Sequence, residues 1–227
     1  MVEYDKHFPF ESIREQQKEA IEFALDSFLN SKKRFCIIEA GTGVGKSAIG
    51  LTVARIVSDM IVESGTVSNG SYFLTTQKIL QSQYEKDFDS MCSIYSSKNY
   101  QCDYHKQNDC QASQQLLKTA DRDSSFFKKC SVSCVYKKQK KSFLESKESV
   151  TNFPYFITES TFSGKITPRN VLVIDEAHNT EDVLSKFVEV SVSQYFCEKI
   201  IKTTWPKKIT PVNFVKWVKN VYYPKVQ

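Results

Sequence analysis

The chain has 227 residues, of which 41% are hydrophobic and 13% aromatic, and it carries a formal net charge of +5. This length accommodates one complete α/β domain with an insertion but excludes two full domains of typical size. The start of the chain lacks the pattern of a secretory leader, and no stretch approaches the roughly 18 apolar residues of a membrane span, so we expect a soluble intracellular protein of the cytoplasm or nucleus without membrane contact.

The first half of the chain predicts a phosphate-binding loop. A helix over 13–29 precedes the apolar run 34–38, which is typical of a buried parallel strand, and apolar residues recur at helical spacing over 46–62. Strand, glycine-rich loop and helix are the order that such a loop requires, although Ala40 replaces its usual first glycine. Backbone N–H groups would contact the β-phosphate, Lys46 the β/γ oxygens and Ser47 a Mg²⁺ ion, which predicts ATP or GTP as ligand. The predicted loop residues are Ala40, Gly41, Thr42, Gly43, Val44, Gly45, Lys46 and Ser47.

A strand over 71–74 and a helix over 77–88 lead into a segment, from about 91 to 141, in which polar, basic and cysteine residues replace the apolar periodicity. Lysines and aromatic residues alternate in this segment, a composition that suits either single-stranded nucleic acid or an ordinary solvated face.

Four cysteines of this segment have the spacing C-x7-C-x19-C-x3-C, at Cys102, Cys110, Cys130 and Cys134. A local cysteine group in an intracellular ATP-binding protein favours metal over disulfides, and four thiolates suit either a [4Fe-4S] cluster or zinc. The open C-x7-C half favours the cluster, Cys92 is a spare candidate ligand, and free thiols are the alternative to a metal site.

The second half of the chain predicts the acidic partner of the phosphate loop. Strands are expected over 150–153 and 171–174, and the second of them ends at Asp175, where open α/β sheets place ligands. Asp175 would hold Mg²⁺ and Glu176 would orient and deprotonate the attacking water. His178 is either a sensor that couples hydrolysis to nucleic acid or a histidine at the start of the helix expected over 180–188.

Taken in order, these motifs resemble the first motor lobe of XPD/DinG-type iron-sulphur DNA helicases of superfamily 2, and the resemblance covers nearly the whole chain. It is carried by residues 8–17, 39–47, 74–77, 98–102, 130–136, 150–153 and 175–179. It implies that Gln17 reads adenine, that Thr75, Thr76 and Gln77 grip the DNA backbone, and that the four cysteines hold a [4Fe-4S] cluster. It also implies 5′ to 3′ travel on single-stranded or forked DNA.

The expected fold is a RecA-like three-layer α/β domain with a mostly parallel sheet. The expected parts are residues 1–90 and 148–190 for the RecA-like lobe, 91–147 for the cysteine-rich iron-sulphur insertion and 191–227 for the start of an arch domain. Family members have a second RecA-like lobe with an arginine finger, so we expect this chain to bind Mg-ATP but to hydrolyse it very slowly unless that lobe is supplied in cis or in trans. Two alternatives remain open: a non-catalytic nucleotide- or DNA-binding interaction module, and a zinc-stabilised nucleic-acid-binding ATPase.

Overall fold

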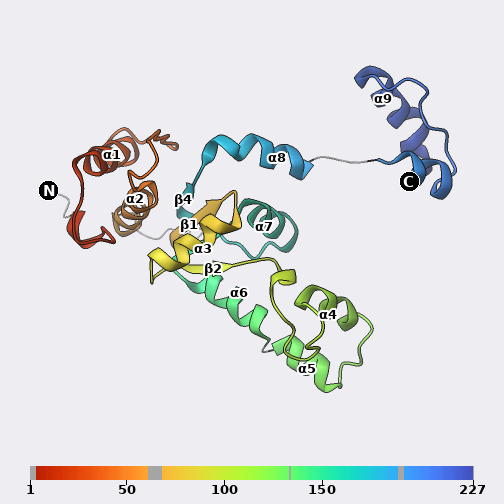
Figure 1. The fold of residues 1–227 in the computed structure, drawn as a ribbon, viewed down its shortest axis with the longest axis horizontal. Helices are drawn as coiled ribbons and strands as arrows, with labels where there is room; N and C mark the ends of the chain where they lie inside the picture. Colours follow the sequence, from red (N-terminus) through yellow and green to blue (C-terminus); the bar gives the residue numbers. More distant parts are fainter. Residues whose placement is uncertain (1–3, 61–67, 133, 189–191, 227) are drawn as a thin grey trace. The chain divides into compact units, whose positions relative to one another are not determined.

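The structure is a computed structural model that describes residues 4–60, 68–132, 134–188 and 192–226. It divides the chain into two units, residues 1–183 and residues 184–227, both drawn in Figure 1. The first unit contains the sheet and every predicted site residue.

The first unit is built on a four-stranded sheet with the order β2-β3-β1-β4, in which every neighbouring pair of strands is parallel. The strands are β1 (Ser68–Thr75), β2 (Cys92–Ile94), β3 (Glu148–Asn152) and β4 (Arg169–Ile174). Strand β1 is buried because it lies between β3 and β4, with Phe73 opposite Val150 on one side and Val173 on the other. The predicted α/β fold with a parallel sheet is therefore confirmed.

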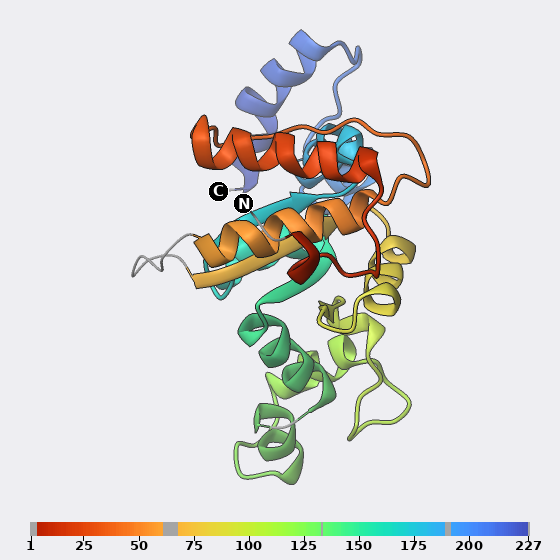
Figure 2. The ribbon, with the colours of Figure 1, turned by 90° about the vertical axis from the view of Figure 1, so that its left-hand side faces the viewer.

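Helices cover both faces of this sheet. On one face lie α2 (Lys46–Met60), against which α1 (Glu15–Leu25) packs, and α3 (Lys78–Asp87); α6 (Val135–Glu145) and α7 (Phe153–Thr158) lie on the other. Figure 2 shows α1 and α2, in red and orange, on the opposite side of the strands from α6. The buried cluster under α2 and α3 comprises Leu51, Ala54, Phe73, Tyr84, Phe88, Met91 and Val150. The cluster on the other face comprises Tyr72, Ile94, Cys110, Cys134, Tyr136, Phe143 and Tyr155.

Short helices complete the first unit. They are η1 (Tyr4–Lys6), η2 (Asp26–Asn30), η3 (Ser97–Asn99), α4 (Cys110–Leu117), α5 (Ser125–Val132), η4 (Glu159–Ser163) and η5 (Ala177–Asn179), and α8 (Thr180–Val188) crosses the division between the units. Asn152 begins α7 by accepting a hydrogen bond from the Tyr155 backbone N–H, and Asp109 begins α4 in the same way through Ala112.

Most predicted elements are found close to their predicted bounds, but the strand predicted over 34–38 is wrong. These residues form no strand in the part of the chain that the structure describes, and the side chains alternate: Cys36 and Ile38 pack against the α1–α2 cluster, whereas Phe35 and Ile37 are 81% and 85% exposed. Among the described residues, this segment lacks the backbone pairing that defines a strand. Residues 92–94, which the sequence assigned to the insertion, instead form β2.

The second unit contains η6 (Phe196–Ile200), α9 (Pro211–Trp217), η7 (Val218–Tyr222) and α10 (Tyr223–Val226). Its small core is aromatic: Trp217 is buried, stacks against Phe214 and donates its indole N–H to the Thr204 carbonyl at 2.7 Å, and Trp205 packs edge-on against it. Within the described ranges, no helix is long and apolar enough to cross a membrane.

Candidate functional site

The glycine-rich loop turns from residue 40 to the first turn of α2 through two left-handed residues. Gly43 and Gly45 have φ angles of +79° and +87°, a region that side chains other than glycine rarely adopt. Gly41, Thr42 and Gly43 are exposed to solvent. The N-terminus of a 15-residue helix follows directly, which places free backbone N–H groups and partial positive charge at this loop.

Two side chains hold the loop in place: Arg14, directly before α1, and Gln17, in its first turn. Gln17, which is only 2% exposed, donates from Nε2 to the Val44 carbonyl at 2.8 Å and accepts the Arg14 backbone N–H at 2.9 Å. The Arg14 guanidinium donates from Nη1 to the Gly43 carbonyl at 3.1 Å. The structure therefore brings Gln17 to the nucleotide loop but occupies both of its amide atoms with the chain itself. The Arg14 contact was not predicted, because nothing in the local sequence relates it to a glycine 29 positions away.

The end of β4 brings the acidic residues to the same loop. Lys46 Nζ lies 3.3 Å from the Ala40 carbonyl and 3.9 Å from Glu176 Oε1, so the lysine stands between the loop and the acidic segment. Asp175 is fixed by its backbone N–H, which donates to the Leu74 carbonyl of β1 at 2.9 Å. Glu176 has a φ of +51°, a left-handed conformation that is uncommon for this residue and costly enough to mark functional positions.

His178 belongs to the same acidic group. Its Nδ1 lies 3.3 Å from Glu176 Oε2 at the start of η5, while the histidine side chain is 70% exposed. Its ring therefore has access both to the predicted general base and to solvent.

Tyr84 of α3 joins the two predicted Mg²⁺ ligands. Its side chain is 3% exposed, and its hydroxyl interacts with the side chains of Ser47 and Asp175. Burial raises the pKa of Asp175. Hydrogen bonds from the Glu176 backbone and the Tyr84 hydroxyl act in the opposite direction and lower this pKa. Burial, and secondly the Asp175 charge, raise the pKa of Tyr84, so the phenol remains protonated and can donate to the carboxylate. No sequence pattern marks Tyr84 as a site residue, because an aromatic residue in a helix is typical of a core position.

The predicted DNA-contact residues lie where β1 ends and α3 begins. Thr75 is fully buried and donates its hydroxyl to the Gln77 carbonyl at 3.1 Å. Thr76 is half-buried with an unpaired hydroxyl, and Gln77 is exposed at the cap of α3. Thr75 thus shapes the turn, whereas Gln77 is the member of this trio that faces solvent.

The four cysteines of the insertion are buried together, at 5–8% exposure. Burial raises the pKa of Cys110 to about 11, and the charges of Cys134, Cys130 and Cys102 add to the rise in that order. Burial also acts first on Cys102, but the pKa of this thiol is lowered overall, and the His105 backbone N–H donates to its sulfur at 3.3 Å. All seven cysteines are free thiols. In the described ranges, no three His, Cys, Asp or Glu side chains converge closely enough to hold a single metal ion.

The parallel sheet with flanking helices is the architecture of a RecA-like domain, and it places the helix start at Lys46 and two carboxylates at one edge of the sheet. A family model described as "Type III restriction enzyme, res subunit" matches residues 11–204, and the chain belongs to this family. This membership makes the chain a helicase-type lobe of superfamily 2. No curated protein matches the chain in sequence.

Proposed function

We propose that the chain is the ATP-binding lobe of a DNA-dependent ATPase and helicase of the XPD/DinG type that moves on single-stranded DNA. The observation that carries this proposal is the approach of Lys46 to Glu176, at 3.9 Å. It brings the lysine of a loop near the start of the chain next to an acidic segment 130 positions later, and phosphoryl transfer needs both groups at one site.

Each residue has a defined part in this proposal. Lys46 and the loop N–H groups hold the phosphates, Ser47 and Asp175 hold Mg²⁺, and Glu176 activates water. Gln17 braces the loop in the nucleotide-free chain and would exchange these contacts for adenine when ATP binds, while His178 couples the base to nucleic acid. The exposed Gln77 and the half-buried Thr76 contact the DNA backbone, and the buried Thr75 supports them.

We also propose that Cys102, Cys110, Cys130 and Cys134 hold a [4Fe-4S] cluster. All four thiols are buried, and the charges of the other three raise the pKa of Cys110, which supports a shared site. When bound, the cluster would act as a structural or electron-carrying group, and these residues would fix α4, α5 and the start of α6 around it.

The catalytic part of the proposal is tested by ATP hydrolysis with and without single-stranded DNA. We expect slow hydrolysis that DNA stimulates and that Glu176→Gln abolishes, while the variant still binds Mg-ATP. Binding of both ligands without any DNA-dependent hydrolysis, even when second-lobe protein is added, would instead support a non-catalytic interaction module.

The cluster is tested by anaerobic purification, a visible absorption spectrum and an iron and sulphide assay. We expect a broad visible band and close to four irons per chain, lost in Cys102→Ser and retained in Cys36→Ser, since Cys36 lies outside the insertion. A colourless protein that contains stoichiometric zinc would contradict this assignment and support the zinc-stabilised alternative.

A further inference from the structure

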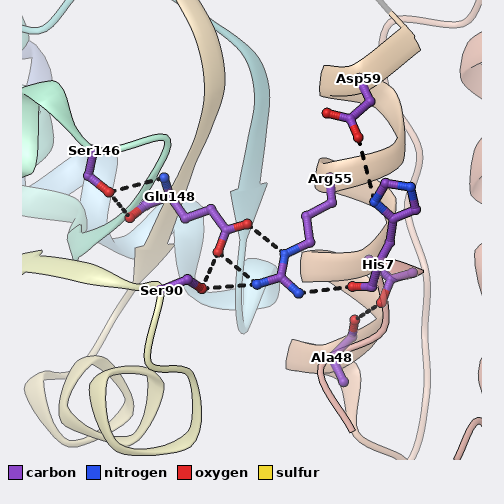
Figure 3. Close-up of polar contacts among 8 residues, drawn as sticks. His7, Ala48, Arg55, Asp59, Ser90, Ser146 and Glu148 are labelled. Carbon is purple, nitrogen blue, oxygen red and sulfur yellow. Dashed lines mark hydrogen bonds and ion pairs between the residues drawn. The ribbon is translucent and has the colours of Figure 1, made fainter. Parts of the chain in front are cut away.

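The Arg55 guanidinium binds three separate segments of the first unit. Its Nε and Nη2 atoms donate to the two carboxylate oxygens of Glu148 at 2.6 and 3.0 Å, in the forked geometry that makes arginine–carboxylate pairs strong. Nη2 also donates to the Ser90 hydroxyl at 2.9 Å, and Nη1 donates to the His7 carbonyl at 3.0 Å. The Ser90 hydroxyl in turn contacts Glu148, so the three side chains form one network (Figure 3).

Two of the three partners of Arg55 lie at the starts of the strands that flank the cysteine-rich segment. Ser90 is two residues ahead of β2, the strand that leads into this segment, and Glu148 is the first residue of β3, the strand by which the chain returns. Helix α6 ends only three residues before Glu148, and the Ser146 hydroxyl in between is bonded to the Glu148 backbone. Cys134 caps the far end of α6. A continuous set of contacts therefore runs from Arg55 through α6 to the cysteines.

Arg55 is also joined to the nucleotide loop by a rigid element. It lies nine positions after Lys46 in α2, which corresponds to about 13 Å along a helix. Helix α2 is tightly packed, with Ala48, Ile49, Leu51, Ala54 and Ile56 at most 2% exposed.

The ion pair between Arg55 and Glu148 is largely shielded from solvent. The side chains of Arg55 and Glu148 are 24% and 14% exposed, and removal of one partner from such a pair leaves a charge poorly solvated. A single ion pair would be enough to hold α2 against one neighbouring segment. Arg55 instead uses its three nitrogens on segments that begin both flanking strands and on the N-terminal segment.

We propose that Arg55 is a positioning residue that couples nucleotide binding at the start of α2 to the placement of the cysteine-rich segment, and thereby to DNA binding. The inference rests on the proposed function, because it requires one chain to bind both Mg-ATP and single-stranded DNA. Nucleotide-dependent displacement of α2 is transmitted through Arg55 to Ser90 and Glu148, and from Glu148 to α6.

The test measures the thermodynamic coupling between the two ligands in the full 227-residue chain. The dissociation constant of a fluorescent single-stranded oligonucleotide is measured without nucleotide and with saturating Mg²⁺ and a non-hydrolysable ATP analogue. The ratio of the two constants is the coupling, for which about fivefold or more is typical of linked sites. The variants are Arg55→Gln, Arg55→Lys and Glu148→Gln.

The chain supplies a matched control in a second ion pair. Lys140 Nζ and Glu159 Oε2 are also 2.6 Å apart, with 17% and 16% exposure, but this pair joins α6 to η4 and does not involve α2. Glu159→Gln therefore removes an equivalent carboxylate charge from an equivalent environment. Chemical unfolding of every variant shows how much stability each loses.

We expect the coupling ratio to fall to within about twofold of one in Arg55→Gln and Glu148→Gln, while Glu159→Gln keeps the wild-type ratio at a comparable loss of stability. Arg55→Lys keeps the charge but loses the fork, so an intermediate ratio is expected, and this milder variant carries the test where Arg55→Gln does not fold. An unchanged ratio in the Arg55 variants, an equal loss in Glu159→Gln, or a wild-type ratio of one would overturn the inference and leave the proposed function intact. Failure of the wild type to bind either ligand would overturn the proposed function itself.

Discussion

A series of alanine substitutions in the glycine-rich loop tests how the structure holds this loop. An added Cβ at Gly41 or Gly43 would meet nothing within 4 Å, but at Gly45 it would lie 2.5 Å from Gln17 Nε2. Gly41 has no left-handed backbone angle, Gly43 has a φ of +79° and Gly45 has a φ of +87°. The three positions thus separate three situations: free space, backbone strain alone, and backbone strain with a steric clash.

The magnitudes follow from these geometries. Gly41→Ala is expected to be neutral or to stabilise the chain by up to about 1 kcal/mol, because alanine reduces the freedom of the unfolded chain. Gly43→Ala adds the left-handed strain of roughly 1–2 kcal/mol and should be destabilising by about 1 kcal/mol net. Gly45→Ala must also displace Gln17 and lose its bond to the Val44 carbonyl, which adds about 1 kcal/mol or more, for a total of about 2–3 kcal/mol.

The assay is chemical unfolding of the nucleotide-free chain, with midpoints and slopes compared across the series. The double variant Gly45→Ala with Gln17→Ala is a further check, because removal of the amide relieves the clash, so the two losses should be clearly less than additive. Equal stability of Gly43→Ala and Gly45→Ala, or strict additivity in the double variant, would refute the role assigned to Gln17.

Three further predictions concern other parts of the first unit. Tyr84→Phe keeps the ring packing but removes a hydrogen bond that opposes the burial-induced rise in the pKa of Asp175. Because only the ionised carboxylate binds Mg²⁺, the pH midpoint of Mg²⁺-dependent nucleotide binding should move upward. An unchanged midpoint would contradict the contact between Tyr84 and Asp175. Ile37→Ser should change the unfolding free energy by less than about 0.5 kcal/mol because Ile37 is 85% exposed. Ile49→Ala, at a position that is only 2% exposed, should lower the unfolding free energy by about 2–5 kcal/mol. A large loss of stability in Ile37→Ser would instead indicate that residues 34–38 form a buried strand. Gln77→Ala should weaken single-stranded DNA binding at least twofold without changing the unfolding midpoint, as expected for an exposed contact residue, and unchanged affinity would remove it from the DNA site.

The sequence predicted the parts of the fold whose signals are local. The helix that starts at Lys46 follows from its glycine loop, and β1 and β4 follow from apolar runs that end in polar residues. The strand expected over 34–38 failed because an apolar run indicates burial only when a partner strand supplies the backbone hydrogen bonds, and composition does not identify that partner. Strand β2 was missed because three residues are too few for any alternation to be detected.

The candidate site was predictable to the same extent. Lys46, Asp175 and Glu176 were found because motif chemistry fixes their residue types and spacing. Arg14, Tyr84 and Arg55 were not, because each acts on a segment far away in the chain that only the folded sheet brings near. The local sequence signal for helix α4 is Asp109, which directly precedes Cys110 and is a strong helix cap.

The most direct test of the account is equilibrium binding of Mg-ATP to the wild-type chain and to Lys46→Ala. Loss of a charged hydrogen bond to phosphate typically costs about 1.5–3 kcal/mol, which predicts Mg²⁺-dependent binding by the wild type and at least roughly tenfold weaker binding by the variant. The Lys46 side chain is 33% exposed and its amine lies 3.3 Å from the Ala40 carbonyl and 3.9 Å from the Glu176 carboxylate, so the unfolding midpoint of Lys46→Ala should differ little from that of the wild type. Equal affinity of the two proteins, or no Mg-ATP binding by the wild type, would contradict the assignment of this loop as the nucleotide site.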